Sequence, residues 1–341
     1  MNARGTRVSA LVVAFGDEPE LGECLDALLQ SVDAVVDVVV VDNGDRSGHL
    51  ARFADNPRVD VYRPATNLGF AGGCNAAASR AAGDVFVLVN PDVIVEPDAL
   101  ARLAEVALEP GVGIATASVR LASEPEVMNS AGNPVHYLGI AWAGGHGEPA
   151  SQHAERTTVA SASGAACAIQ ATLWRDLGGF DPMYFAYHED VELSLRCWQR
   201  GRQVVYVPAA IVFHHYEFSR NTGKNYLLER NRLVTVVTTY SVRTLLLIAG
   251  PLLALELAVI AVAAADGWLG AKLRGYGWLV THLPALITRH RRLQHERTRS
   301  DSDMFGLYET RFEATNVPKV RAQLALNSVA ARYGRLLRRL V

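Results

Sequence analysis

Acidic residues in this chain stand directly after two apolar runs. The run of residues 85–89 leads into Asn90 and, two residues later, Asp92. The run of residues 35–41 ends on Asp42. Apolar runs of this length are typical of strands that are buried on both faces of a sheet. Ligands of open α/β sheets bind outside the carboxyl ends of such strands. We therefore expect Asp42 and Asp92 at one edge of a sheet, where a nucleotide and a metal ion would be bound.

Two other groups of polar residues have the types that catalysis and metal binding require. Glu189 and Asp190 form an acidic pair, and His214 and His215 end a further apolar run. A carboxylate within hydrogen-bond reach of an alcohol can act as a general base. Aspartate and histidine are also suitable ligands for Mn²⁺ or Mg²⁺ when phosphate oxygens complete the coordination. The plainer interpretations are an acidic first helical turn, favoured by the helix dipole, and a polar pair where a strand reaches the surface.

The elements that would position these residues alternate between strands and helices. Apolar runs predict strands over residues 8–15, 35–42, 59–62 and 84–89, and helical spacing predicts helices over 21–29, 71–82 and from 97 onward. Alternation of this kind predicts a mostly parallel sheet with helices on both faces. Residues 111–168 are less regular and are expected to hold extra strands and an acceptor-side loop. Helices are predicted again over 171–177 and 189–200, and strands over 204–207 and 211–213.

Composition excludes several classes of protein. Half of the 341 residues are apolar and a fifth are charged, which excludes wholesale disorder. The four cysteines form no Cys-x-x-Cys pair. A reducing cytosol is therefore expected, rather than a zinc knuckle or a disulfide framework. The first apolar run is short and lacks a cleavage site, so we expect no signal peptide. No nucleic-acid partner is expected either.

The C-terminal region differs in character from the rest of the chain. Residues 244–265 are apolar except for Glu256, and their length is close to the ~20 residues that cross a bilayer. Glu256 would cost about 3 kcal/mol at a membrane centre, and Pro251 could split the run in two. Aromatic residues and arginines follow, and residues 318–341 are predicted to form a basic helix, which is typical of a membrane surface. We expect peripheral, monotopic or re-entrant association rather than a true span, with a buried helical hairpin as the alternative.

Six short motifs follow one another along the chain. They are Asp42-Asn43-Gly44, Asn67-Leu68-Gly69-Phe70-Ala71-Gly72-Gly73-Cys74-Asn75, Leu88-Val89-Asn90-Pro91-Asp92-Val93, Gly178-Gly179-Phe180-Asp181, Tyr184-Phe185-Ala186-Tyr187-His188-Glu189-Asp190-Val191-Glu192-Leu193 and His214. Their order and spacing resemble the family 2 inverting glycosyltransferases, in particular the rhamnosyltransferase-like and galactofuranosyltransferase-like branch. The resemblance covers about residues 7–235. The apolar and basic C-terminal helices also resemble the membrane-associating tail of that branch.

The resemblance implies a GT-A fold, a nucleotide-diphosphate sugar donor and a divalent cation, Mn²⁺ or Mg²⁺. Asp92 matches the metal-binding position of the family's Asp-x-Asp motif, in which Asn90 replaces the first acid. His214 would be the second protein ligand, with His215 as the alternative. Asp42 would contact the nucleotide base, with a cap on the strand-end turn as its ordinary alternative. The donor cleft would be lined by Asn67, Gly69, Gly72, Gly73, Asn75 and Asn90.

The same resemblance implies a role for each residue of the acidic pair, Glu189 and Asp190. Asp190 matches the family's catalytic base, which would take the proton of the acceptor hydroxyl during one direct displacement that inverts the anomeric centre. Glu189 would contact the acceptor or orient the site. The Gln-x-x-Arg-Trp motif of processive members does not occur where it is expected, and residues 226–231 occupy that region. Transfer of a single sugar is therefore expected.

The sequence thus predicts an inverting, metal-dependent glycosyltransferase in residues 1–240 and a helical, membrane-associating region in residues 241–341. It would move one sugar, of the rhamnose or galactofuranose kind, onto a lipid-linked or cell-surface glycan at the cytoplasmic face of the cell membrane. A polyprenyl-linked acceptor fits a basic, apolar region because such a substrate is met at the bilayer face. One alternative is a nucleotidyltransferase, although residues 16–19 are acidic and would repel a triphosphate. The other alternative is a non-catalytic membrane scaffold.

Overall fold

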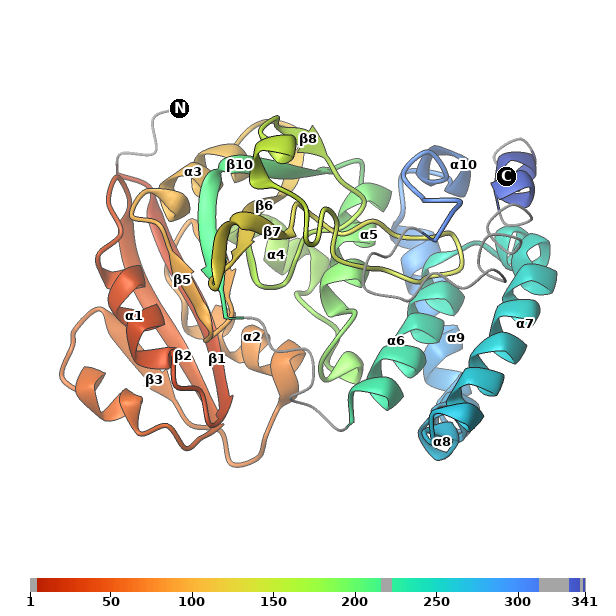
Figure 1. Cartoon of the computed structure of the whole chain (residues 1–341), viewed down its shortest axis with the longest axis horizontal. Helices are drawn as coiled ribbons and strands as arrows, with labels where there is room; N and C mark the ends of the chain where they lie inside the picture. The colour runs from red at the N-terminus through yellow and green to blue at the C-terminus, as the bar shows by residue number, and fades with distance from the viewer. Residues whose placement is uncertain (1–4, 216–222, 313–330, 338–339, 341) are drawn as a thin grey trace. The chain divides into compact units, whose positions relative to one another are not determined.

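The computed structural model describes residues 5–215, 223–312, 331–337 and 340 of the chain (Figure 1). The chain forms two compact units. The first comprises Met1–Asn133, Ala143–Cys197 and Arg202–Glu217, and the second comprises Pro134–Trp142, Trp198–Gly201 and Phe218–Val341. The candidate site residues named above, from Asp42 to His215, all belong to the first unit.

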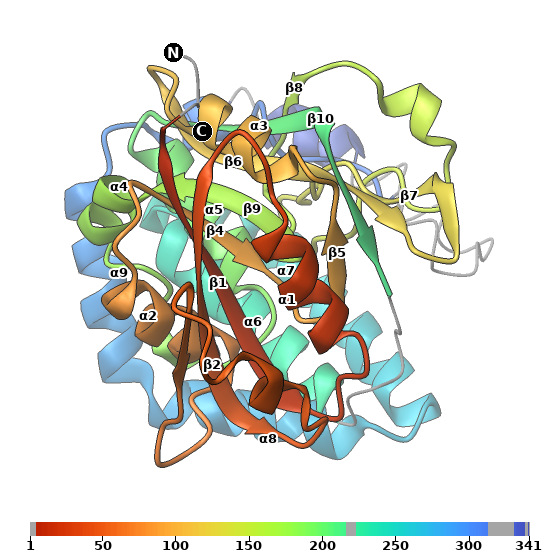
Figure 2. The same ribbon diagram turned by 90° about the vertical axis from the view of Figure 1, so that its left-hand side faces the viewer.

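The amino-terminal half of the sheet is parallel, as the sequence predicts. β1 (Arg7–Gly16) pairs in parallel with β2 (Val35–Asp45) and with β4 (Val85–Val89), and β2 pairs in parallel with β3 (Val59–Tyr62). Figure 2 shows β1 and β2 side by side. Every residue of β4 and most residues of β1 are buried. Burial on both faces explains why these sequences are continuous apolar runs rather than alternating ones.

The other half of the sheet is mixed, which differs from the mostly parallel sheet that the alternation predicts. β9 (Ala166–Gln170) runs antiparallel to both of its neighbours, β4 and β6 (Val112–Leu121). β10 (Gln203–His214) pairs in parallel with β6 and antiparallel with β5 (Val93–Val95). The order of the main strands among the described residues is β3-β2-β1-β4-β9-β6-β10-β5. A buried apolar run has the same composition in either direction, so the sequence could not reveal that β9 is reversed.

β10 is one bent strand rather than the two short strands that the sequence predicts. Its pairing with β6 changes register between Val207 and Ile211, and Pro208 lies within the change. Proline has no N–H to donate to a ladder, so it is tolerated where the pairing is interrupted. β7 (Glu124–Ser130) pairs with β6, and β8 (Thr157–Thr158) pairs with β10. These two strands lie in the stretch whose sequence is least regular.

Helices pack against the sheet of the first unit. α1 (Leu21–Leu29) and α3 (Ala99–Ala107) contribute buried leucines to a hydrophobic core that they share with the valines of β1, β2 and β4. Each fully buried leucine stabilises the fold by about 1.5–3 kcal/mol relative to an exposed one. The other helical elements of this unit are η1 (His49–Phe53), α2 (Gly69–Arg80), η2 (Ala150–His153), α4 (Ala171–Leu177), η3 (Pro182–Tyr184) and α5 (Glu189–Gln199), whose last two residues belong to the second unit.

The second unit is mainly helical in its described part, apart from stretches such as Pro134–Trp142. Its labelled helices are α6 (Lys224–Thr239), α7 (Val242–Ala265), α8 (Leu269–Thr281), α9 (Leu283–Glu296) and α10 (Asp301–Met304), and residues 331–337 are helical as well.

α7 continues through Pro251, so the split that this proline could have caused does not occur. A proline inside a helix removes the hydrogen bond to the carbonyl four residues earlier, which here belongs to Leu247. The Tyr333 hydroxyl donates to the Leu247 carbonyl oxygen at 2.5 Å and replaces that bond.

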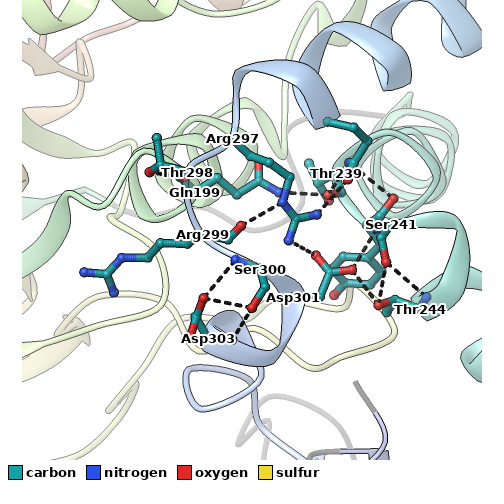
Figure 3. Close-up of polar contacts among 12 residues, drawn as sticks. Gln199, Thr239, Ser241, Thr244, Arg297, Thr298, Arg299, Ser300, Asp301 and Asp303 are labelled. Atoms are coloured by element: carbon teal, nitrogen blue, oxygen red, sulfur yellow. Dashed lines mark hydrogen bonds and ion pairs between the residues drawn. The ribbon is translucent and has the colours of Figure 1, made fainter.

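Polar contacts hold the start of α7 to the segment around α10 (Figure 3). Ser241 caps α7, and its hydroxyl accepts a hydrogen bond from the Thr244 N–H at 3.2 Å. Asp301 accepts a hydrogen bond from the Ser241 N–H at 2.7 Å and pairs with Arg297 at 2.6 Å. These contacts determine where α7 begins. The basic helix predicted for residues 318–341 lies largely outside the described residues.

Candidate active site

Asp92 and His214 lie together at the edge of the sheet. His214 is the last residue of β10, and its pairing with β5 puts it opposite Val93, the residue after Asp92. The Nε2 atom of His214 lies 3.2 Å from Oδ1 of Asp92. The backbone N–H of His215 donates to the Asp92 carbonyl oxygen at 2.9 Å. The structure thus brings together two of the residues that the sequence associates with a metal ion.

Asn129 of β7 orients the His214 ring. Its side-chain oxygen lies 3.1 Å from Nδ1 of His214, and both residues are buried. An amide oxygen accepts hydrogen bonds, so this contact suits a proton on Nδ1, and it leaves Nε2 directed at Asp92. No pattern in the sequence identifies Asn129 as a partner of His214. Asn129 comes close to β10 only because β7 pairs with β6, the neighbour of β10.

The Asp92 and His214 side chains fit a divalent cation. Oδ1 of Asp92 is buried and has no hydrogen-bond partner among the described residues. A buried carboxylate oxygen without a donor is costly unless a positive charge compensates it. A carboxylate oxygen and an imidazole nitrogen are donors that Mn²⁺ accepts. Within the described part of the chain no group of three or more His, Cys, Asp and Glu residues could hold a metal ion. Substrate oxygens would therefore have to complete the coordination.

His215 faces a different partner. Its Nδ1 atom lies 3.8 Å from Oε1 of Glu20, and its side chain is 39% exposed. Glu20 precedes α1, and its Oε2 is buried without a hydrogen-bond partner among the residues described. The contact geometry therefore favours His214 over His215 as the partner of Asp92. Glu20 was not among the residues that the sequence singled out.

Asp190 lies in the first turn of α5 with both carboxylate oxygens held by backbone N–H groups. Oδ2 accepts a hydrogen bond from Gly164 at 3.0 Å, and Oδ1 accepts one from Val191 at 2.8 Å. Burial raises the pKa of Asp190, and the two N–H groups offset only part of that rise. Asp190 is therefore an oriented carboxylate with a stronger affinity for a proton than a solvated one has.

Glu189 is buried beside Asp190. Its Oε2 atom has no hydrogen-bond partner within the described ranges. Burial, and then the negative charge of Asp190, raise the pKa of Glu189. Two carboxyl groups this close cannot both ionise easily, so the pair holds a proton more readily than either acid would alone.

A short line of backbone contacts joins the two acidic groups of the site. Gly164, which donates to Asp190, precedes Ala165, and the Ala165 carbonyl accepts a hydrogen bond from the Asn90 N–H at 2.9 Å. Asn90 begins the turn that carries Asp92. β4 and β9 are paired up to Val89 and Ala166, so this line is a continuation of the sheet ladder. Backbone contacts therefore connect Asp190 to the turn that carries Asp92, and Asp92 in turn contacts His214.

Asp42 makes the contacts of a turn cap. Its Oδ1 accepts hydrogen bonds from the N–H groups of Gly44 and Asp45 at 3.1 and 2.8 Å. Its Oδ2 pairs with Nε of Arg63 at 2.7 Å. Burial raises the pKa of Asp42, but Arg63 and the two N–H groups outweigh it, and the net effect lowers the pKa. The ordinary alternative for Asp42 is thus present in the structure, and contact with a nucleotide base stays a prediction.

The start of α2 offers fewer donors to phosphate than its glycine-rich sequence indicates. The Leu68 N–H donates to the Asn43 side chain at 3.1 Å, and the Gly69 N–H donates to the Asn67 side chain at 2.7 Å. The Ala71 N–H donates to the Phe185 carbonyl at 3.0 Å. The first N–H groups of a helix can bind an anion only when no other acceptor uses them. Lining of the donor cleft by Asn67, Gly69, Gly72 and Asn75 stays a prediction.

Comparison with known proteins was consistent with this geometry. Residues 6–235 match the model of a family described as glycosyltransferase like family 2. The chain is 28% identical over 240 residues to an N-acetylglucosaminyl-diphospho-decaprenol L-rhamnosyltransferase of Mycobacterium tuberculosis, which covers 63% of this chain and 77% of the relative. It is 29% identical over 231 residues to the O-antigen biosynthesis protein RfbC of Myxococcus xanthus, which covers 64% of this chain and 18% of that protein.

Two solved structures share the architecture. The mannosyltransferase PcManGT from Pyrobaculum calidifontis, in complex with GDP-Man and Mn²⁺, superposes with a TM-score of 0.52 at 19% identity and covers 84% of this chain and 85% of its own. GalNAc-T7 with UDP, GalNAc and Mn²⁺ superposes with a TM-score of 0.54 at 18% identity. That match covers 70% of this chain, which spans 48% of the GalNAc-T7 chain. At these identities the likeness is one of fold, and it confirms the predicted GT-A architecture.

Proposed function

The chain belongs to the glycosyltransferase like family 2, whose model matches residues 6–235, and on that premise we propose that it is an inverting transferase of single sugars. The donor would be a nucleotide-diphosphate sugar, and the acceptor a glycan linked to a polyprenyl lipid. We assign transfer to residues 1–240 and membrane association to residues 241–341. The observation that carries the proposal is the Asp190 carboxylate, which is oriented by Gly164 and Val191 and joined by backbone contacts to the turn that holds Asp92.

Asp190 would act as the general base. An acceptor hydroxyl is a poor nucleophile, and a carboxylate oxygen within hydrogen-bond reach takes its proton as the new glycosidic bond forms. The raised pKa of Asp190, caused by burial, brings its proton affinity closer to neutral pH and so improves a base for this task. Glu189, whose pKa is also raised, would keep its proton and leave Asp190 as the ionised member of the pair. Direct displacement by the hydroxyl needs no protein nucleophile and inverts the anomeric centre.

Asp92 and His214 would hold a divalent cation, Mn²⁺ or Mg²⁺, together with diphosphate oxygens of the donor. When bound, such a cation neutralises the negative charge that grows on the leaving diphosphate. Asn129 supports this role because its side-chain oxygen contacts Nδ1 of His214 and so keeps Nε2 turned to Asp92. The Mn²⁺ in both solved relatives of the fold is consistent with this assignment.

The nature of the acceptor is proposed from the relatives and from α7. The mycobacterial relative is named for transfer of L-rhamnose to a decaprenol-linked N-acetylglucosaminyl diphosphate. Among the described residues, α7 is the one helix long and apolar enough to cross a membrane, and only 6% of its apolar window is buried. Leu246, Leu253 and Leu257 of α7 are each at least 60% exposed. An apolar face of this size is unusual for a protein surface that meets only water.

The charges around Glu256 favour a helix that lies at the membrane surface over one that crosses the bilayer. Glu256 contacts Arg232 of α6 and Lys272 of α8, and it accepts a hydrogen bond from the Tyr276 hydroxyl at 2.6 Å. Lys272 also pairs with Glu229 at 2.5 Å and is almost completely buried. Extracting α7 from this network would leave buried charges without partners, at a cost of about 3–5 kcal/mol for a broken pair. We therefore propose monotopic association at the cytoplasmic face, with α7 still packed on α6 and α8.

Transfer can be tested with the purified protein. It would be incubated with a synthetic polyprenyl-diphosphate-linked N-acetylglucosamine and a panel of nucleotide-diphosphate sugars that includes activated rhamnose, with Mn²⁺ or with excess chelator. We expect the acceptor to gain the mass of one sugar, with inverted anomeric configuration and only when the cation is present. If no donor in the panel releases its nucleoside diphosphate, the result would argue against a transferase. Full activity in excess chelator would exclude the cation from the mechanism.

Membrane association needs a separate test. Vesicles of anionic and neutral phospholipids would be sedimented with the wild-type protein and with a variant carrying Leu246→Ser, Leu253→Ser and Leu257→Ser. The variant should stay in the supernatant, because the apolar face is what enters the lipid. Val32→Ser is the matched control, since Val32 is an exposed apolar residue of the first unit. Equal sedimentation of all three proteins would show that α7 is not the contact surface.

A further inference from the structure

α2 contacts the segment that leads into the acidic pair, and Asn75 is the centre of that contact. The Asn75 side-chain N–H donates to the Phe180 carbonyl at 2.7 Å, and the side-chain oxygen accepts from the Phe180 N–H at 3.0 Å. Both halves of the amide are therefore used on one backbone position. A paired amide contact of this kind fixes both the position and the orientation of the peptide that it holds.

Two glycines make room for the contact, one on each side. Gly179 has a φ of +66°, and a Cβ there would lie 2.4 Å from the Asn75 side-chain oxygen. Gly69 has a φ of +70°, and a Cβ there would lie 2.3 Å from the Phe185 carbonyl oxygen. Side chains at either position would push α2 away from the segment. The two glycine-rich motifs, at residues 67–75 and 178–181, therefore meet in one close contact.

The segment held in this way is strained. Phe185 has φ 63° and ψ −65°, and the Ala186 N–H donates to the Tyr184 carbonyl at 2.8 Å, which is a γ-turn with positive φ. Tyr187 and His188 also have positive φ values, 68° and 73°. Such conformations persist only where surrounding contacts impose them. Here the Ala71 N–H, which donates to the Phe185 carbonyl, supplies one such contact from α2.

α5 holds the same turn from its other side. Arg196 donates to the carbonyls of Leu177 and Gly179, at 2.7 Å each, and forms a buried pair with Glu192 at 2.7 Å. The turn at residues 177–180 therefore lies between Asn75 of α2 and Arg196 of α5. α5 also carries Glu189 and Asp190 in its first turn.

We propose that Asn75 is a positioning residue for Asp190, acting through residues 178–188, rather than a residue that binds the sugar donor. This inference rests on the proposed function, because it needs Asp190 to be the base. Asn75 touches neither Asp190 nor a reacting atom. It holds the strained segment that sets where the first turn of α5 begins, and a catalytic group displaced by about 1 Å can cost about 10²-fold in rate.

The two roles of Asn75 predict opposite kinetic effects of Asn75→Ala. A positioning residue should lower kcat about 10²-fold, while the dissociation constant of the nucleoside diphosphate with Mn²⁺ changes less than about twofold. A donor-binding residue should weaken nucleoside diphosphate binding and leave kcat at saturating donor nearly unchanged. Gln170→Ala is the matched control, because Gln170 also donates a side-chain amide to a backbone carbonyl, that of Ala107, but at the opposite end of β9. The control should keep the wild-type kcat.

Gly69→Ala gives a second route to the same displacement if Asn75→Ala folds poorly. The added methyl group would press on the Phe185 carbonyl, so kcat should again fall while nucleoside diphosphate binding is retained, and that retained binding reports that the variant is folded. Weakened nucleoside diphosphate binding with unchanged kcat in either variant would overturn the inference. If the wild-type protein transfers no sugar, the proposed function fails first. If it transfers sugar and both variants keep its kcat, only the positioning role fails.

Discussion

Two groups of buried or partly buried acids, one in each unit, differ in how their charge is matched. In the second unit, Glu229 and Glu256 both contact Arg232 and Lys272, so two acids face two cations. In the first unit, Asp92 and Glu189 each keep a buried oxygen that no hydrogen bond satisfies among the described residues.

The pKa values follow the same division. Burial raises the pKa of Glu229, but Arg232 and Lys272 outweigh burial and lower it to about 2. Burial and the neighbouring Asp190 raise the pKa of Glu189. A network whose charges are all matched has no need of a ligand and serves to join helices. Acids that keep a buried oxygen without a hydrogen bond are typical of sites that bind substrate or cation.

The largest effect is expected at the base. Asp190→Asn should lower kcat about 10³-fold, because the amide cannot take the proton of the acceptor hydroxyl. Nucleoside diphosphate binding, measured by calorimetry with Mn²⁺, should be retained. Glu105→Gln, on the exposed face of α3, is the control and should keep wild-type turnover. A kcat for Asp190→Asn equal to that of the control would exclude Asp190 as the base.

The next effect separates function from stability at Asp92. Asp92→Asn should lower the rate of transfer about 10²-fold at saturating Mn²⁺, because one ligand of the cation is weakened. Thermal unfolding of the cation-free protein should shift little or upward, since the substitution removes a buried charge without a hydrogen bond on Oδ1. A marked loss of stability would show that Asp92 is a structural residue like Glu256.

Glu256→Gln should behave in the reverse way. Breaking a buried, balanced network should lower the free energy of unfolding by about 3 kcal/mol, because Arg232 and Lys272 lose a counter-charge. Chemical denaturation of the full chain would measure this loss. Nucleoside diphosphate binding by the first unit should persist under native conditions. Unchanged stability would show that this network contributes little to holding α7.

The smallest effects concern pH, and the two units should give opposite signs. The lowered pKa of Glu229 means that its stabilising contribution is lost as the pH falls from its ordinary value of 4.5 towards about 2. The raised pKa of Glu189 means that its contribution is lost as the pH rises above that ordinary value. The free energy of unfolding would be measured as a function of pH for both variants. Glu229→Gln should flatten the acidic side of the profile, and Glu189→Gln should flatten the side at higher pH. A flattening on the same side for both would contradict the contrast.

Part of this arrangement could be predicted from the sequence, since it follows from local patterns. Val85–Val89 is apolar throughout and ends beside Asp92, which indicates a buried strand with a polar end. The choice between His214 and His215 could not be made, because a shift of one residue in a strand exchanges its two faces. Asn129 and Glu20 carry no local signal and meet the histidines only through pairing between distant segments.

The sequence also could not show which residues of the glycine-rich motifs contact a ligand and which contact another part of the chain. Asn75 was expected to line the donor cleft, and the structure shows that its amide contacts Phe180, which no local pattern indicated. Glycines that admit a ligand and glycines that admit another backbone have the same pattern, since both mark a close approach. Only the partner, here Asn75 for Gly179 and Phe185 for Gly69, distinguishes the two.

The most direct test of the contrast between the two units is anomalous diffraction from crystals of the full chain grown with Mn²⁺ and a nucleoside diphosphate. We predict a manganese peak in contact with Oδ1 of Asp92 and Nε2 of His214, with diphosphate oxygens completing its coordination. A nucleoside diphosphate bound with no manganese at this pair, or with manganese at Glu20 and His215 instead, would contradict it.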